Sequence, residues 1–150
     1  MKKIIYICLL MPLVFQSCKK AYSPGDNYPI VNVLPPYAAF KSLATVNVKL
    51  NADHVTPGAA AFTFLIRTAL QQTVTVTYSV SGAITLTNQT AVIPRDATTV
   101  AISVPVPAGT APGTATIVLN KAVAADGTVF TIGQDNVAAN QKASIKITQL

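Results

Sequence analysis

The sequence lacks most of the residues from which metal-binding and catalytic sites are built. Its 150 residues include no tryptophan and no glutamate, with a single histidine and two cysteines. Zinc sites need sets of His, Cys and carboxylate ligands that such a chain cannot easily supply. All five acidic residues are aspartates in turn-like stretches, where aspartate is a common turn former. We therefore predict no metal site, no cofactor and no catalytic residues, although a glycosidase-like carboxylate pair assembled by the fold stays an open alternative.

Charge is also scarce. Charged residues make up 11 % of the chain, and the formal net charge is +6. Lys2 and Lys3 lie in a segment that we expect to be cleaved, after which nine basic residues face five acidic ones, a net charge of +4. Because nucleic-acid binding usually needs a clustered basic stripe, the scattered lysines and arginines predict no nucleic-acid partner.

The amino terminus has the pattern of a bacterial signal peptide. Lys2 and Lys3 precede an apolar run over 4–15, which contains Pro12. As a helix this run would span roughly 18 Å, short of the ~30 Å needed to cross a bilayer. It therefore favours a cleaved signal over a permanent membrane span.

The residues around Cys18 predict a lipid anchor. In Val14-Phe15-Gln16-Ser17-Cys18-Lys19-Lys20, small Ser17 precedes the cysteine and bulky Phe15 stands three residues before it. This pattern resembles a lipobox of Bacteroidota lipoproteins, with Gln16 departing from the usual small residue. We expect a signal peptide over 1–17 and lipidation of Cys18; a plain secretory signal is the alternative.

A lipidated Cys18 would place the protein in the bacterial cell envelope as an outer-membrane lipoprotein. Stable anchoring needs more than one acyl chain, and lipidated amino-terminal cysteines carry two or three. Lys19 and Lys20 would lie at the headgroups and add attraction to anionic lipid. The leaflet that the domain faces, periplasmic or surface, stays open.

A tether follows over 18–36, rich in chain-breaking pairs such as Pro24-Gly25 and Pro35-Pro36. Within it, 30–34 could form a first edge strand. Tyr22, Tyr28 and Tyr37 also lie in or next to this segment, where packing at the base of the domain is the simpler role and a ligand platform the alternative.

The rest of the chain, 37–150, alternates apolar and polar residues with period two. In 73–81, Val74, Val76, Tyr78 and Val80 share one face, while threonines and serines share the other. This pattern predicts a half-buried strand. Further strands are expected around 46–50 and 62–66, and over 84–87, 90–93, 98–106, 114–119, 128–132 and 143–148; no helix of useful length appears.

Short strands separated by polar turns predict an all-β fold: an immunoglobulin-like antiparallel β-sandwich with Greek-key connections. A closed barrel is the alternative. Phe62, Phe64, Tyr78 and Phe130 fall on inward phases and are expected in the core. Pro105 lacks an N–H and falls on the outward phase of its strand, which suits an edge.

The segment from Thr73 to Ile147 resembles a Calx-β module. Thr73-Val-Thr-Val-Thr-Tyr-Ser-Val-Ser-Gly82 is similar to that family's "V-x-V-x-Y-x-x-x-G" strand, and the stretch from Ala91 to Val104 is similar to its strand, turn, strand element. Asp96 stands where the family usually has glycine. The acidic loop clusters that bind calcium in some members are missing, so the resemblance implies the fold and transfers no site.

Only one pair invites a catalytic interpretation. Asp53 and His54 are adjacent in the loop 51–58, but a triad also needs a nucleophile and oxyanion donors, so a solvated turn is expected. We predict a membrane-anchored, non-catalytic module that binds an envelope protein or has a structural role. A glycan-binding accessory lipoprotein of a carbohydrate-uptake system is the alternative, and a small hydrolase is a third.

Overall fold

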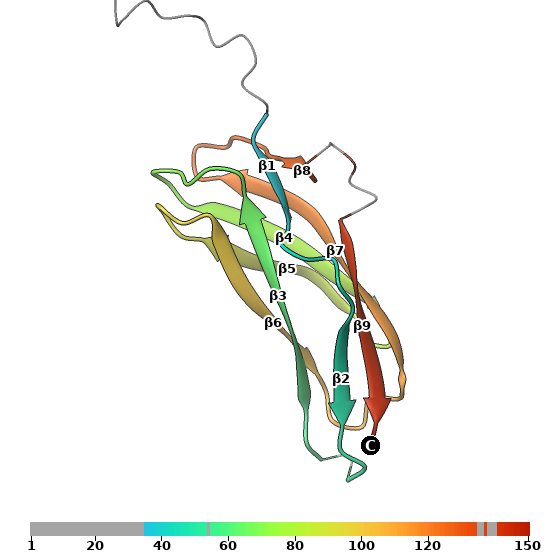
Figure 1. Cartoon of the computed structure of the whole chain (residues 1–150). Helices are drawn as coiled ribbons and strands as arrows, with labels where there is room; N and C mark the ends of the chain where they lie inside the picture. Colours follow the sequence, from blue (N-terminus) through green and yellow to red (C-terminus); the bar gives the residue numbers. More distant parts are fainter. Residues whose placement is uncertain (1–34, 54, 135–136, 138–140) are drawn as a thin grey trace, which may run out of the picture. The chain divides into compact units, whose positions relative to one another are not determined.

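The computed structural model describes residues 35–53, 55–134, 137 and 141–150 (Figure 1). The predicted signal peptide, Cys18, the tether as far as residue 34, the possible strand over 30–34, and His54 all lie outside the described residues. The described unit, Leu34–Leu150, contains a complete hydrophobic core, whose members all lie between Ala38 and Ile147.

Nine strands account for the regular structure of the described residues, which include no helix. They are β1 (Tyr37–Phe40), β2 (Val46–Leu50), β3 (Gly58–Ile66), β4 (Val74–Gly82), β5 (Leu86–Ile93), β6 (Thr99–Val106), β7 (Gly113–Ala124), β8 (Thr131–Ile132) and β9 (Lys142–Gln149).

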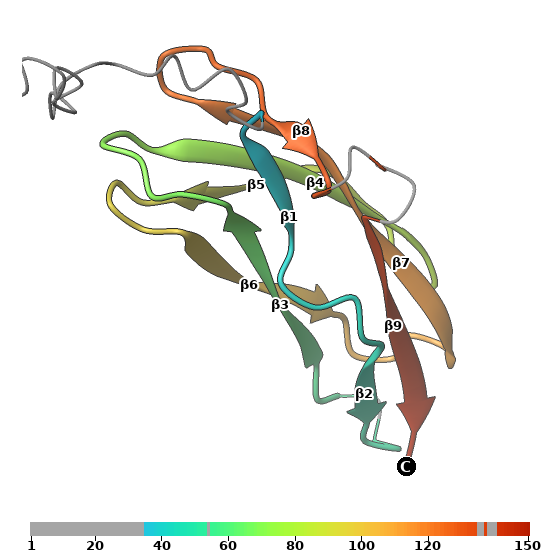
Figure 2. The same cartoon turned by 45° about the horizontal axis from the view of Figure 1, so that its top comes forward.

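The strands form two sheets packed face to face, as Figure 2 shows. Sheet A has the order β6-β3-β1-β8, and sheet B has the order β2-β9-β7-β4-β5. Most neighbours are antiparallel, but β1 is parallel to β8 and β2 is parallel to β9. The described chain thus begins in sheet A with β1 and then crosses to sheet B, where β2 forms an edge strand. The predicted all-β, immunoglobulin-like sandwich is confirmed, but its sheets are mixed and not purely antiparallel as predicted.

The alternating sequence pattern explains the core. On β4, Val74, Val76, Tyr78 and Val80 are buried, while the residues between them are exposed or half-buried. The same holds for Phe62, Phe64 and Ile66 on β3, and Phe130 is also buried. Inward aromatic and branched side chains from both sheets therefore fill one core, and the inward phases predicted from the sequence are confirmed.

Five strands differ from their predictions, among them β3, which begins at Gly58 although a strand was expected only around 62–66. β1 was not predicted, because Ala38, Ala39 and Phe40 are all buried and show no alternation. The separate strands expected over 84–87 and 90–93 form one strand, β5, which contains Asn88 with a φ of 51°. β7 continues through Ala124 over a stretch with local helical preference, and only Thr131 and Ile132 of the predicted 128–132 form β8.

The edge prediction for Pro105 agrees with the structure, and Asp96, which stands where the Calx-β family usually has glycine, has a backbone conformation that glycine favours. Pro105 lies on β6, an edge strand of sheet A, so its missing N–H removes nothing from the ladder. Asp96 has a φ of 61°, the left-handed conformation that aspartate tolerates better than most residues.

Candidate functional site

The Asp53 carboxylate serves its own loop. Its Oδ1 accepts hydrogen bonds from the backbone N–H of Val55 at 3.0 Å and of Thr56 at 3.4 Å. Its Oδ2 accepts one from the Thr56 hydroxyl at 3.3 Å. These contacts are those of an aspartate-stabilised turn, and they show how Asp53 shapes the loop between β2 and β3.

The described aromatic side chains gather in the core. The Phe40 ring centroid lies 4.9 Å from that of Phe64 and 6.1 Å from that of Phe62, and Phe64 lies 5.4 Å from Tyr78. Burial raises the pKa of the Tyr78 hydroxyl above its ordinary value. Tyr37 is half-buried, so the described part of the chain presents no exposed aromatic pair of the kind expected for a sugar platform.

A polar network joins three loops at one end of the sandwich. Gln71 Nε2 donates to Asp96 Oδ1 at 2.6 Å, Gln71 Oε1 accepts from Arg95, and Arg95 also pairs with Asp96 at 3.3 Å. Gln72 Nε2 donates to Asp126 Oδ2 at 2.8 Å and, with the backbone N–H of Thr128, holds the pKa of Asp126 below its ordinary value. Because these groups satisfy one another, the network stabilises the loops.

No metal-binding constellation and no spanning helix occur in the described ranges. Within 35–53, 55–134, 137 and 141–150, no group of three or more His, Cys, Asp or Glu side chains could hold a metal ion. Across the same residues, no helix is long and apolar enough to cross a membrane.

Within the residues that the structure describes, one half of β3 has backbone hydrogen-bonding groups without a partner strand. β1 pairs with β3 only at Phe64, Leu65 and Ile66, and the chain then leaves for sheet B. β3 continues beyond this point as far as Gly58, paired on its other side with β6 (Figure 1). Among the described residues, the stretch Gly58–Phe62 therefore has no strand hydrogen-bonded to it on the β1 side, although β2 packs against its Gly58 end. We call this stretch the β3 half-edge.

Two backbone hydrogen bonds show which backbone groups of β3 point toward the side that β1 has left. Lys41 donates from its N–H to the Thr63 carbonyl at 2.9 Å, on the β1 side. Ile66 donates to the Thr98 carbonyl at 2.9 Å, on the β6 side. Because bonding direction alternates along an antiparallel strand, the N–H and C=O groups of Ala59 and Ala61 point to the side that β1 has left.

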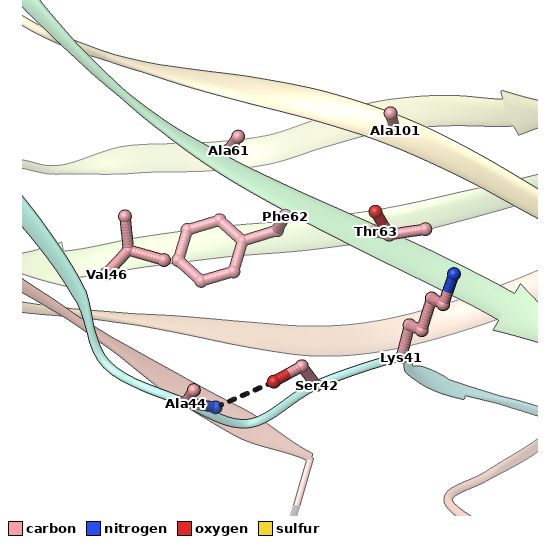
Figure 3. Close-up of a pocket in the computed structure, with 8 residues that line it drawn as sticks. All are labelled: Lys41, Ser42, Ala44, Val46, Ala61, Phe62, Thr63 and Ala101. Atoms are coloured by element: carbon pink, nitrogen blue, oxygen red, sulfur yellow. Dashed lines mark hydrogen bonds between the residues drawn. The ribbon is translucent and has the colours of Figure 1, made fainter.

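A shallow hollow of about 400 Å³ lies along the β3 half-edge (Figure 3). Lys41, Ser42 and Ala44, from the segment that crosses between the sheets, form one wall, with Ser42 Oγ accepting from the Ala44 N–H at 3.2 Å. The remaining lining residues come from β2, β3 and β6: Val46, Ala61, Phe62, Thr63 and Ala101. The lining carries one positive charge, on Lys41, and no carboxylate, and the exposed Leu43 lies in the same crossing segment.

The other strand edges are protected in ways that the β3 half-edge is not. β6 carries Pro105, β8 is only two residues long, and β5 is interrupted at Asn88, where its register with β4 shifts. β2 has an exposed lysine, Lys49. Proline, short length, irregularity and lysine are the devices by which natural sheets prevent unwanted pairing. Gly-Ala-Ala-Ala-Phe, the sequence of the β3 half-edge, contains none of them.

Sequence reasoning did not find this site. The signal that could have pointed to it is the run of small residues 58–61, which leaves room for a neighbouring backbone. At Gly58 an added Cβ would lie 2.5 Å from Val48 Cγ1, so glycine is needed there for β2 to pack against β3.

Comparison with known proteins identifies the fold. No protein-family model matches the chain, and no curated protein matches it. The apo-form CBD1 domain of Calx superposes with a TM-score of 0.52 at 11 % identity, covering 78 % of this chain and 99 % of that domain. A two-domain protein of unknown function from Bacteroides fragilis gives a TM-score of 0.51 at 8 % identity, covering 77 % of this chain and 46 % of the other. The chain thus has a Calx-β-like sandwich fold, as its sequence resemblance predicts.

Proposed function

We propose that this Calx-β-like chain is a lipoprotein of the bacterial cell envelope, anchored through Cys18, with a non-catalytic sandwich that binds an extended segment of a partner protein. The binding site in this proposal is the β3 half-edge. The partner would add a strand to sheet A beside Gly58–Phe62, in the position that β1 leaves vacant.

The lipobox pattern supports the anchor. A short apolar run, a small residue at Ser17 and a cysteine directly after it are what a lipoprotein signal requires, and Lys19 and Lys20 suit a headgroup environment. Lys19 directly after Cys18 favours an outer-membrane location, because in enterobacteria an aspartate at that position marks lipoproteins of the inner membrane.

The outward backbone groups of Ala59 and Ala61 carry the protein-binding part of the proposal. Strand addition obtains affinity from main-chain hydrogen bonds and specificity from alternate side chains. The methyl side chains on this stretch leave space for an incoming backbone, and the hollow beside Phe62 can receive a side chain. Lys41 at one end favours a partner segment with a carboxylate there. We prefer this role to glycan binding because it rests on a positive feature of the described residues.

Substitution of Cys18 tests the anchor. Cys18→Ala is expected to move the protein from the membrane fraction to the soluble fraction or to leave an unprocessed precursor, and mass spectrometry of the wild-type amino terminus should show an acylated Cys18. Cys8→Ala is the matched control, because Cys8 leaves with the signal peptide. A wild-type mature chain without acyl groups would overturn the anchor.

Site-specific cross-linking tests the binding site. A photo-reactive amino acid at Ala61 should cross-link a discrete partner in intact cells, whereas one at Thr75, exposed on sheet B, should not. Ala59→Pro, which removes one outward donor, should weaken the cross-link from position 61. Equal cross-linking from both positions, or no effect of Ala59→Pro, would contradict strand addition at the β3 half-edge.

A further inference from the structure

Among the described residues, the outer face of sheet B carries four lysines and no aspartate. Lys49 lies on β2, Lys121 on β7, and Lys142 and Lys146 on β9; all four are exposed. They belong to one face, because Lys49 and Lys146 alternate with buried residues of their strands and Lys121 lies opposite Thr77, on the outward phase of β4. We call this surface the lysine face.

The register places these lysines beside one another and among hydroxyl side chains. Lys146 lies between Asn47 on β2 and Thr114 on β7, and Lys49 is opposite Thr148, diagonal to Lys146 at about 7–8 Å. Lys142 precedes Lys146 by four residues, about 13 Å along β9. The positive charges are thus spread over several strands.

The described carboxylates lie elsewhere. Asp53, Asp96 and Asp126 are all in loops that join strands, where they bond to their own loops or to neighbouring ones. The described residues contain five lysines and two arginines against these three aspartates, and four of the seven cations are on the lysine face. In the described part of the chain, none of the four has a carboxylate partner. Four neighbouring lysines without carboxylate partners among the described residues indicate a surface that binds a negatively charged ligand.

We propose that the lysine face docks on the surface of an anionic phospholipid bilayer. Lipid phosphates are the complementary chemistry, and mobile headgroups can rearrange to meet cations spaced roughly 7–13 Å apart. A protein partner would be expected to meet a buried aromatic or large aliphatic anchor. Around its lysines the described face instead offers threonine, serine and asparagine, with Val92, Val118 and Val123 as apolar side chains and no aromatic one. Docking in this way leaves the β3 half-edge uncovered, because it belongs to sheet A and its backbone groups point along the plane of that sheet.

This proposal rests on the proposed anchor at Cys18, which would hold the domain near the membrane. A tether of 19 residues spans at most about 65 Å and holds the domain at high local concentration near the bilayer. The attraction itself belongs to the domain, so it is testable without the lipid. Each lysine near an anionic surface strengthens binding about five-fold.

The test uses residues 34–150, which contain the complete core, without Cys18. Sedimentation with vesicles of phosphatidylcholine plus 30 % phosphatidylglycerol should show binding that is absent with phosphatidylcholine alone and is lost in 0.5 M salt. Each of K49Q, K121Q, K142Q and K146Q should weaken binding about five-fold, and the four together about 600-fold if their effects add. R67Q, away from the lysine face, is the control and is expected to change it less than two-fold.

The inference is overturned if the domain binds both vesicle types equally, or if R67Q weakens binding as much as each of the four lysine-face variants. Polyglutamate serves as a model of an acidic protein. If the amide chemical shifts of the lysine face change with polyglutamate but not with anionic vesicles, the face binds a protein and the proposal is wrong. Thermal unfolding of each variant verifies folding. Failure here would leave the Cys18 fractionation result unchanged, so the two proposals fail separately.

Discussion

Gln141 Oε1 accepts a hydrogen bond from the backbone N–H of Phe40 at 3.0 Å, and Gln141 is the one buried polar residue of the described core. The neighbouring strand β8 bonds β1 only as far as Ala38, whose carbonyl accepts from the Gly133 N–H at 2.8 Å. Phe40, the last residue of β1, would otherwise bury an unpaired donor. Gln141 thus replaces β8 as the partner of Phe40 and supports the point at which the chain leaves β3 uncovered.

Replacing Gln141 should destabilise the fold. Gln141→Leu removes the acceptor and leaves the Phe40 N–H buried without a partner, which is expected to lower the free energy of unfolding by about 1–3 kcal/mol. Gln134→Leu, at an exposed position, is the control and should change it by less than about 0.5 kcal/mol. Urea denaturation measures both; equal values for the two variants would contradict the role of Gln141.

Phe64 is the centre of the aromatic cluster. It is fully buried and contacts both Phe40 and Tyr78. Phe64→Ala should cost about 3–5 kcal/mol, the range for deleting a buried phenylalanine side chain. Leu43→Ala, at a residue that is 46 % exposed, should cost much less. A loss below about 1 kcal/mol for Phe64→Ala, seen in thermal or denaturant unfolding, would contradict the observed packing.

Tyr78 should make the fold sensitive to alkaline pH. Burial raises its pKa in the folded state, so the neutral hydroxyl is favoured by folding. This contribution to stability is complete below the unfolded pKa of about 10 and is lost as pH rises through the higher folded value. Denaturant midpoints measured from pH 8 to 11.5 should therefore fall more steeply for the wild type than for Tyr78→Phe. Parallel curves for the two proteins would disprove this linkage.

Proline substitutions at adjacent positions should distinguish the side of β3 that is paired with β6 from the unpaired side. Ala61→Pro removes an N–H that faces the β3 half-edge and has no partner strand among the described residues, so it should cost less than the neighbouring substitution, as edge strands tolerate proline. Ala60→Pro removes an N–H that faces β6 and leaves the opposite Val104 carbonyl without its donor, at a cost of about 1–3 kcal/mol before any loss of packing. Similar costs for the two, measured by calorimetry, would show that both sides of β3 are paired.

The strands with regular alternation were predictable, and the site was not. β4 could be predicted because each outward threonine or serine separates two apolar residues, a pattern incompatible with a helix. β1 could not, because Ala38, Ala39 and Phe40 are all buried. The β3 half-edge depends on where β1 stops pairing, and that point involves Gln141, about 100 residues away. Period-two patterns define the faces of a strand but not its neighbours, so neither this half-edge nor the lysine face could be derived from them.

The amide hydrogen exchange of β3 tests the central claim, that Ala59 and Ala61 present unpaired backbone groups. In residues 34–150 free of any partner, the amides of Ala60 and Phe62 should exchange at least about 1,000-fold more slowly than those of an unstructured chain, because they bond to β6. The amides of Ala59 and Ala61 should exchange far faster than their neighbours. Uniform strong protection from Ala59 to Phe62 would contradict the account.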